Sequence, residues 1–267
     1  MNSKRIISVK HLELFHEGGF GGQIYKADDL HGRNAYIIKC ERYAQAINEY
    51  AAHSFIRAIG LPAPAVKLIR IEEAVLREYG ITVPFDVFGG VEYVADAVPA
   101  NGKSVYLDRT EAQMSIFSQL MIINQLLGDL DATVEIYQKD DALFLLDLGE
   151  TVVGEEMVKM AITDEEPYVL AFQMVCKKAA RIEKIETQIE SGKTFCRFYM
   201  ERSGTVNESL IREAVVTVLE RISMMKMTEM RSCFLGLKEA YGEGLADGYR
   251  LYFNQLRGTC RLIRKYM

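Results

Sequence analysis

The feature that most constrains the fold of this chain is a change of hydrophobic pattern near residue 100. Before it, short runs of β-branched and aromatic residues alternate with turns that contain glycine, proline or aspartate, which is typical of strands. After it, apolar residues recur at spacings of three and four over long segments, which indicates helices. We therefore expect an α+β protein with a strand-rich first third, a mainly helical remainder and a boundary near residues 95–103.

The strand-rich part also contains one helix, predicted for residues 44–59. Its apolar residues recur at helical spacing, Gly60 ends it, and Pro62 and Pro64 prevent its continuation. The strands predicted around it are residues 5–9, 23–27, 35–39 and 66–71, with further strand material within residues 81–94.

The helical part begins with a nearly apolar segment, residues 111–127, which suits a buried helix. A loop, a short strand, a turn and a buried strand over residues 142–146 follow it. Helical periodicity then predicts four further helices, over residues 168–190, 206–227, 229–241 and 245–265.

Composition and charge indicate an ordinary soluble protein. Hydrophobic residues make up 49% of the 267 residues and charged residues 26%, and the net charge of −5 gives no sign of nucleic-acid binding. The five cysteines are scattered and form no CxxC pair, which favours reduced thiols over a disulfide framework. The sequence shows no apolar signal core and no run of transmembrane length. We expect a cytoplasmic protein that neither spans a membrane nor binds nucleic acid.

Histidine is confined to the first 53 residues, and this excludes much hydrolytic and metal chemistry. A Ser-His-Asp relay would need its base within that stretch, and no pair of histidines has the spacing of zinc ligands. Carboxylates and lysine must therefore carry any chemistry that occurs later in the chain.

A cluster of glycines, Gly18, Gly19, Gly21 and Gly22, follows the first strand. Backbone without Cβ atoms can approach phosphate groups closely and offer them N–H donors. The alternative is a loose hairpin turn that binds nothing, since glycine-rich turns are common.

Lys39 and Glu49 come next along the chain. Lys39 ends an apolar strand, so its ammonium group either lies in a cleft and pairs with phosphate oxygens or reaches solvent. Glu49 shares a helix with apolar residues, and it either points inward to hold Lys39 or faces water. Their order after a glycine-rich stretch favours the paired interpretation.

Two aspartates follow buried segments in the helical part. Asp131 comes after the apolar helix, where a carboxylate can accept a proton from a substrate hydroxyl. Asp147 follows five apolar residues, and a carboxylate at the end of a buried strand is costly unless it is paired or bound to a metal. Mg²⁺ needs few protein carboxylates when substrate phosphates complete its coordination shell. The alternative for both aspartates is a structural role in a turn or helix cap.

In their order along the chain, these segments resemble the protein-kinase-like superfamily, in the atypical branch of HipA-type serine/threonine kinases and phosphoinositide kinases. Asn48-Glu49-Tyr50, together with Gly60-Leu61-Pro62-Ala63-Pro64, is similar to a HipA-type helix and the turn that ends it. Gly128-Asp129-Leu130-Asp131 is similar to the family's Gly-Asn-x-Asp catalytic element, and Asp147-Leu148-Gly149 to its metal-binding Asp-x-Gly element. The resemblance covers residues 5–155.

The resemblance implies a bilobal protein-kinase-like fold, with a strand-rich lobe at residues 1–98 and a helical lobe at residues 99–267. It implies an ATP-dependent kinase that uses Mg²⁺ and phosphorylates a hydroxyl of a protein or small molecule. The glycines would cover the phosphates, Lys39 would bind the α- and β-phosphates and Glu49 would hold Lys39. Glu92 and Val94 would contact adenine through backbone groups, Asp147 would carry Mg²⁺ and Asp131 would orient or deprotonate the acceptor.

The chain departs from the family pattern at two places. Ala132-Thr133 stand where the family usually has Arg-His after the catalytic aspartate, and Ile136 stands where it has a metal-binding asparagine. Isoleucine cannot ligate a metal, so the adjacent Glu135 is the candidate for a second metal ligand. Two alternatives are a pseudokinase, which binds nucleotide as a regulatory or interaction module without transferring phosphate, and an α+β binding protein unrelated to kinases.

Overall fold

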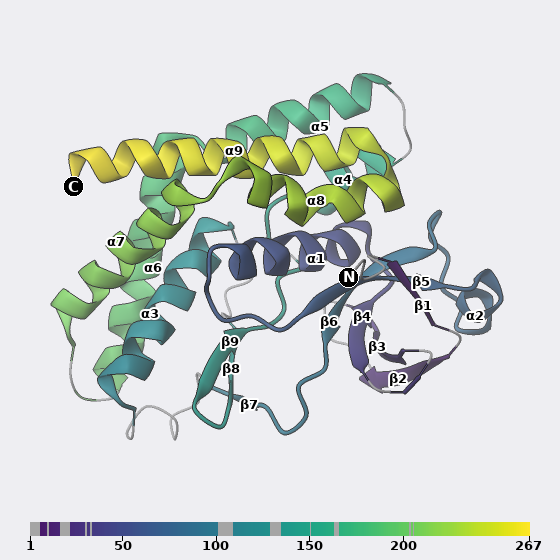
Figure 1. The fold of residues 1–267 in the computed structure, drawn as a ribbon, viewed down its shortest axis with the longest axis horizontal. Coiled ribbons are helices and arrows are strands. Elements are labelled where there is room, and N and C mark those ends of the chain that lie inside the picture. Colours follow the sequence, from purple (N-terminus) through teal and green to yellow (C-terminus); the bar gives the residue numbers. More distant parts are fainter. Residues whose placement is uncertain are drawn as a thin grey trace.

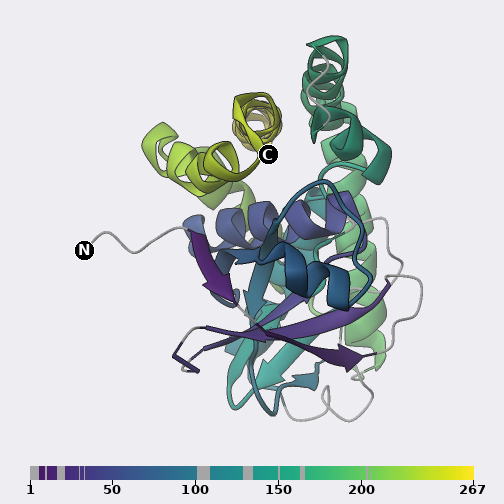
Figure 2. The same ribbon diagram turned by 90° about the vertical axis from the view of Figure 1, so that its right-hand side faces the viewer.

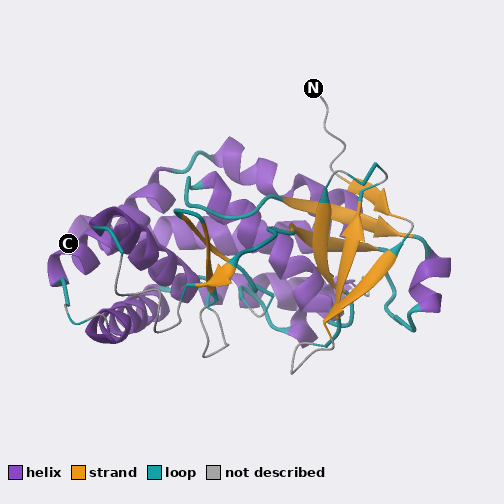
Figure 3. Cartoon of the chain, turned by 90° about the horizontal axis from the view of Figure 1, so that it is seen from below, coloured by secondary structure: helices purple, strands orange, loops and turns teal. Residues whose placement is uncertain are grey.

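The structure is a computed structural model. It describes residues 6–9, 11–16, 22–29, 31–32, 34–100, 109–128, 135–149, 151–162, 166–202, 204 and 206–267. Strands gather at one end of the chain's long axis, and helices make up most of the rest (Figure 3). Among the described residues, no helix is long and apolar enough to cross a membrane.

The strand-rich lobe is built on one six-stranded sheet. Its strands are β1 (Ile6–Val9), β2 (Leu12–His16), β3 (Ile24–Asp28), β4 (Ala35–Lys39), β5 (Val66–Ile71) and β6 (Val87–Glu92). They lie in the order β1-β5-β6-β4-β3-β2, so β2, β3 and β4 form consecutive hairpins on one side, and the first strand, β1, is the edge strand on the other. All neighbouring strands are antiparallel except β1 and β5, which are parallel.

Helix α1 (Tyr43–Ala58) lies between this sheet and the helical lobe (Figure 1). It is buried on almost every side, which suits a helix that packs on β6 below and on α8 (Met227–Tyr241) above. Gly89 of β6 permits the close approach, because a Cβ atom there would lie 2.4 Å from the carbonyl oxygen of Ala46. The short helix α2 (Glu73–Glu78) connects β5 to β6.

A small three-stranded sheet, in the order β7-β8-β9, lies between the large sheet and the helices. Its strands are antiparallel: β7 (Val98–Pro99), β8 (Ile136–Lys139) and β9 (Ala142–Leu145). Helix α3 (Glu111–Leu126) packs against β9 and begins with a capping box, in which Thr110 and Gln113 satisfy each other's backbone N–H groups.

In the helical lobe, the long helix α9 (Glu243–Tyr266) packs against several other helices. Figure 2 views α9 nearly end-on, with α8 and α5 (Glu166–Ala179) on either side of it. Gly248 lets α5 pack closely on α9, because a Cβ atom there would meet the Phe172 ring at 1.9 Å. The remaining helices are α4 (Glu155–Ile162), α6 (Ile182–Arg202) and α7 (Glu208–Met224).

The predicted α+β class and most predicted elements are confirmed; the strands at 35–39 and 66–71 agree with β4 and β5 at both ends. The single helix predicted for residues 168–190 is wrong, because α5 ends at Ala179 and a separate helix, α6, begins at Ile182. No glycine or proline marks this break. Thr259 of α9 donates a hydrogen bond to the Ala180 carbonyl at 2.7 Å, a tertiary contact that occupies the end of α5. The short helices α2 and α4 have no counterpart among the predicted elements.

Candidate functional site

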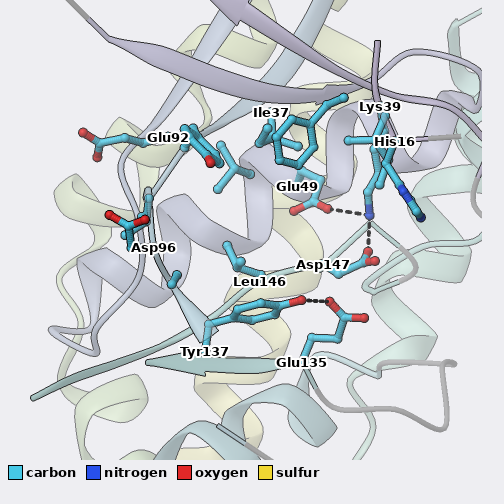
Figure 4. A pocket seen from close by; sticks show the side chains of 16 residues that line it. His16, Ile37, Lys39, Glu49, Glu92, Asp96, Glu135, Tyr137, Leu146 and Asp147 are labelled. Atoms are coloured by element: carbon cyan, nitrogen blue, oxygen red, sulfur yellow. Dashed lines mark hydrogen bonds and ion pairs between the residues drawn. The ribbon is translucent and has the colours of Figure 1, made fainter. Parts of the chain in front are cut away.

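A cavity of about 380 Å³ lies between the large sheet and the small sheet. Its walls come from β2, β3, β4 and β6 on one side, and from β8 and the segment after β9 on the other. Ile37 faces Leu146 and Tyr137 across the middle of the cavity, which is apolar, and the polar groups gather toward its two ends (Figure 4). Ile24 also lines the cavity. A mainly apolar hollow with a few convergent polar groups is the usual form of a small-molecule site.

Lys39 lies at one end of this cavity, between two carboxylates. Its Nζ atom is 3.2 Å from Oε1 of Glu49 and also contacts Oδ1 of Asp147 (Figure 4). Lys39 ends β4, Glu49 lies in the middle of α1, and Asp147 follows β9. Two neighbouring elements, β4 and α1, therefore meet the distant segment after β9 at one ammonium group, so the structure brings these three residues together.

The charges of this cluster support one another. Burial alone would lower the pKa of Lys39, but the negative charges of Glu49 and Asp147 outweigh it and raise that pKa above its ordinary value. Burial alone would raise the pKa of Glu49, but Lys39, and then a contact with His53, hold it well below its ordinary value. Lysine and glutamate are therefore both charged at neutral pH, although both side chains are buried.

Glu49 also contacts the segment that carries Asp147. Its Oε2 atom accepts a hydrogen bond from the backbone N–H of Leu148 at 3.2 Å. His53, one helical turn along α1, places Nε2 3.2 Å from the same oxygen, although this contact lacks the direction of a hydrogen bond and is therefore electrostatic. One carboxylate thus fixes the lysine of one lobe and the backbone beside the aspartate of the other.

Alternation along β8 and the residue just before it, Glu135, decides which side chains face the cavity. Glu135 and Tyr137 line it, whereas Ile136 between them is fully buried in the hydrophobic core. The Tyr137 hydroxyl donates a hydrogen bond to Oε2 of Glu135 at 3.4 Å. Burial, and then the negative charge of Asp147, raise the pKa of Glu135. The two carboxylates therefore interact electrostatically at the charged end of the cavity, where Lys39 acts in the opposite direction and lowers the pKa of Glu135.

The opposite end of the cavity is formed by the connection after β6. Glu92 and Val94, predicted to contact a base through their backbone, both line the cavity, with Glu92 far from Lys39 (Figure 4). The Glu92 side chain accepts a hydrogen bond from the backbone N–H of Ala65 at 3.2 Å, and its own N–H donates to the Ala65 carbonyl at 2.8 Å. The Glu92 side chain is therefore held at the start of β5.

Several predicted site residues lie outside the described residues. They are Asp131, the predicted catalytic residue, and Gly18, Gly19 and Gly21 of the glycine cluster. Gly22 is described, and its φ of +81° lies in the left-handed region that favours glycine. The strands on either side of the cluster, β2 and β3, pair antiparallel, with His16 opposite Ile24.

His16, Asp96 and Tyr137 are polar cavity residues that are not among the predicted site residues. Tyr137 could have been found by extending strand alternation two residues beyond Glu135. His16 ends the strand before the glycine cluster, and Asp96 follows β6 with φ of +61°. Neither of these last two residues carries a sequence signal that separates it from an ordinary loop residue.

The donor set fits Mg²⁺ together with a phosphate-bearing ligand. No cluster of three or more His, Cys, Asp or Glu suited to a metal is present among the described residues. A magnesium site in a phosphoryl-transfer enzyme needs only one or two carboxylates, because phosphate and water oxygens supply the other ligands. Asp147 and Glu135 both line the charged end of the cavity, and Lys39, which contacts Asp147, places a positive charge beside them, so the residues present are of the kind that such a site uses.

Comparison with known proteins gives one line of similarity. No protein-family profile and no curated protein sequence matches the chain. Among solved structures, the crystal structure of a Helicobacter pylori proinflammatory kinase, CtkA, is similar, with a TM-score of 0.51 and 12% sequence identity. The match covers 97% of this chain and 98% of that chain. Identity this low shows the fold alone: this chain has an α+β, bilobal, kinase-like fold.

Proposed function

We propose that this chain is an ATP-dependent phosphotransferase, related in mechanism to the HipA-type kinases that its sequence resembles. The observation that carries the proposal is the position of Lys39, held by Glu49 and Asp147 at one end of a cavity between two lobes. An ammonium group from the sheet, a glutamate that fixes it and an aspartate from the other lobe are the charges that phosphoryl transfer requires. The kinase-like fold supports this assignment.

The apolar middle of the cavity would hold the nucleotide base. We propose a lobe boundary between residues 98 and 99, and the segment just before it, with Glu92 and Val94, would contact adenine through backbone groups. Ile37 above and Leu146 below would enclose the base between apolar surfaces. The glycine cluster would cover the phosphates with backbone N–H groups.

The charged end would hold the phosphates and the metal. Lys39 would pair with the α- and β-phosphates, Asp147 would ligate Mg²⁺ and Glu135 would be its second carboxylate. Bound Mg²⁺ neutralises charge that develops on the transferred phosphoryl group. Asp131 would orient the acceptor hydroxyl, of a protein or a small molecule, or take its proton.

The test is transfer of labelled phosphate from ATP, followed by mass spectrometry of the protein and of added hydroxyl acceptors. The wild-type chain should transfer phosphate with Mg²⁺, and both Asp131→Ala and Asp147→Ala should abolish transfer. Asp141→Ala is the matched control. This exposed aspartate lies in the turn between β8 and β9, six residues before Asp147, and does not line the cavity. Transfer that survives in Asp147→Ala would exclude the proposed mechanism.

A second function is favoured by Ile136. Its side chain is fully buried where the HipA-type kinases have a metal-binding asparagine, so one familiar metal ligand is missing. A chain of this kind can bind nucleotide as a regulatory module without transferring phosphate. ATP would then raise the thermal unfolding temperature of the wild type, and no transfer would occur in the wild type or in either aspartate variant.

A further inference from the structure

Asn48, the neighbour of Glu49 on α1, holds the backbone that follows Asp147. Its Nδ2 atom donates hydrogen bonds to the carbonyl oxygens of Gly149, at 2.8 Å, and of Val153, at 2.9 Å. Its Oδ1 atom accepts a hydrogen bond from the hydroxyl of Tyr249 at 2.5 Å. The side chain of Asn48 is fully buried.

These bonds fix the orientation of the Asn48 amide. A flipped amide would turn its oxygen toward two carbonyl oxygens and lose both bonds. The Tyr249 hydroxyl, which approaches the amide oxygen, supplies the donor that stabilises the observed orientation. A buried polar group whose bonds are all satisfied costs little and specifies one geometry, whereas an apolar residue here would leave two carbonyls without these partners.

The segment that Asn48 holds needs such support. Asp147 and Val152 have φ of +53° and +62°, a conformation that residues with a Cβ atom seldom adopt. The segment also passes so close to α1 that a Cβ atom on Gly149 would lie 3.0 Å from the Gln45 side chain. Strained backbone of this kind persists when surrounding contacts determine it.

Tyr249 extends these contacts to the C-terminal helix. It lies on α9, is fully buried, and its ring centroid is 5.9 Å from that of Phe172 on α5. A continuous path of buried contacts therefore runs from α5 and α9, through Asn48 of α1, to the carbonyls of Gly149 and Val153. In Figure 1, α1 lies between the sheets and α9, so these contacts extend to the side of α1 that is opposite the sheets.

We propose that Asn48 is a positioning residue for the segment that carries Asp147, and that Tyr249 sets the orientation of its amide. The part of this inference that concerns Mg²⁺ rests on the proposed function. Partners that orient a metal ligand without touching the metal commonly change metal affinity tenfold or more when they are removed. Asn48 and Tyr249 would likewise act without touching the metal, by holding the backbone that follows Asp147.

The first test replaces Tyr249 with phenylalanine, which keeps the ring against Phe172 and removes the hydroxyl. Tyr252→Phe is the matched control: Tyr252 lies one turn along α9, is buried, and donates its hydroxyl to the Leu126 carbonyl at 3.2 Å instead. Amide exchange in peptides that contain Leu148 and Val153 should quicken about tenfold in Tyr249→Phe. The control should leave exchange in these peptides unchanged.

The second measurement is the dependence of ATP binding on Mg²⁺. Tyr249→Phe should weaken the apparent Mg²⁺ affinity about tenfold, while ATP affinity measured in EDTA stays at the wild-type value. A purely structural role would lower both affinities together or neither. The inference would be overturned if Tyr249→Phe and Tyr252→Phe showed the same amide-exchange rates in the peptides that contain Leu148 and Val153 and the same dependence of ATP binding on Mg²⁺.

Asn48→Asp gives an independent test of the same contacts. The carboxylate keeps an acceptor for Tyr249 but faces the carbonyls of Gly149 and Val153 with no donor. It should quicken exchange in the same peptides more than Tyr249→Phe does, and exchange at the wild-type rate would contradict the proposal. If the wild type binds no ATP, the proposed function fails, and the exchange comparison alone still decides whether Asn48 and Tyr249 position the segment.

Discussion

Among single residues, Glu49 has the most consequential set of contacts. Its carboxylate faces Lys39, the backbone N–H of Leu148 and the ring of His53, and the side chain is buried. A buried charge that loses its partner is far more destabilising than an exposed one, because water cannot replace the lost contact. Substitutions at Lys39 or Glu49 therefore affect stability as well as ligand binding.

The Glu49 carboxylate should make the stability of the wild type sensitive to acid. Its neighbours lower its pKa from 4.5 in the unfolded chain to about 2 in the fold, so the folded state binds its proton less readily. This contribution is fully present above pH 4.5 and is lost as the pH falls toward 2. Urea unfolding at a series of pH values should therefore show the stability advantage of the wild type over Glu49→Gln shrinking by about 3 kcal/mol across this range.

Comparing the two proteins cancels the contribution of carboxylates far from residue 49, because their surroundings are the same in both. A difference in unfolding free energy that stays constant from pH 5 to pH 2 would show that the Glu49 carboxylate is not stabilised by its neighbours.

Among single residues, the sequence predicts the charged residues of the cavity better than the residues that position the segments around them. Lys39, Glu49 and Asp147 each adjoin a strongly apolar segment, so burial and order along the chain were enough to predict that they meet. Asn48 and Tyr249 lie 201 positions apart, and nothing local in either segment indicates their hydrogen bond. Such contacts depend on how distant helices pack.

At the scale of elements, helix α1 depends on another helix for its N-terminal cap. Arg42 at its N-cap position makes no capping bond with its side chain. Instead Glu155, in the first turn of α4, accepts hydrogen bonds from the backbone N–H groups of Tyr43 and Ala44 at 2.8 and 2.7 Å. A carboxylate here both satisfies unpaired N–H groups and complements the helix dipole.

Removal of this cap should destabilise the fold. Glu155→Ala should lower the free energy of unfolding by about 1–2 kcal/mol, measured by urea denaturation. Glu156→Ala is the matched control, since Glu156 is the next residue, is exposed and belongs to the same helix turn. Equal stability of the two variants would show that Glu155 does not cap α1.

Two glycines of α9 should respond to alanine in opposite directions. At Gly248 the new methyl group would meet the Phe172 ring, so Gly248→Ala should cost about 1–3 kcal/mol of unfolding free energy. At Gly258 the space is open within 4 Å, so Gly258→Ala should stabilise by up to about 1 kcal/mol through helix propensity. Thermal denaturation of both variants checks this, and a stabilised Gly248→Ala would contradict the packing of α5 on α9.

The elements also show where sequence patterns stop being informative. Periodicity predicts one helix over residues 168–190, because apolar spacing continues across the end of α5. The break is set by contacts with α9, among them the bond from Thr259 to the Ala180 carbonyl. Periodicity reports which face is buried, and it does not report where a tertiary contact turns the chain.

At the scale of the whole molecule, the arrangement brings charges from both lobes to one cavity. The likeness to a Helicobacter pylori kinase at 12% identity shows that this fold is kept with few shared residues. The two-lobe division followed from the change of hydrophobic pattern, whereas the cavity itself depends on how the small sheet faces the large one. If the proposed phosphotransfer occurs, positioning and charge neutralisation are expected to account for most of the catalysis.

The most direct test of the central claim is calorimetric titration of ATP into the wild type and Lys39→Ala, each with Mg²⁺ and with EDTA. Lys67→Ala, on β5 of the same sheet and outside the cavity, is the control. The wild type and the control should bind ATP more tightly with Mg²⁺ than with EDTA, and Lys39→Ala should bind about tenfold or more weakly. Wild-type protein that binds no ATP, or Lys39→Ala that binds it as tightly as the wild type, would contradict the account.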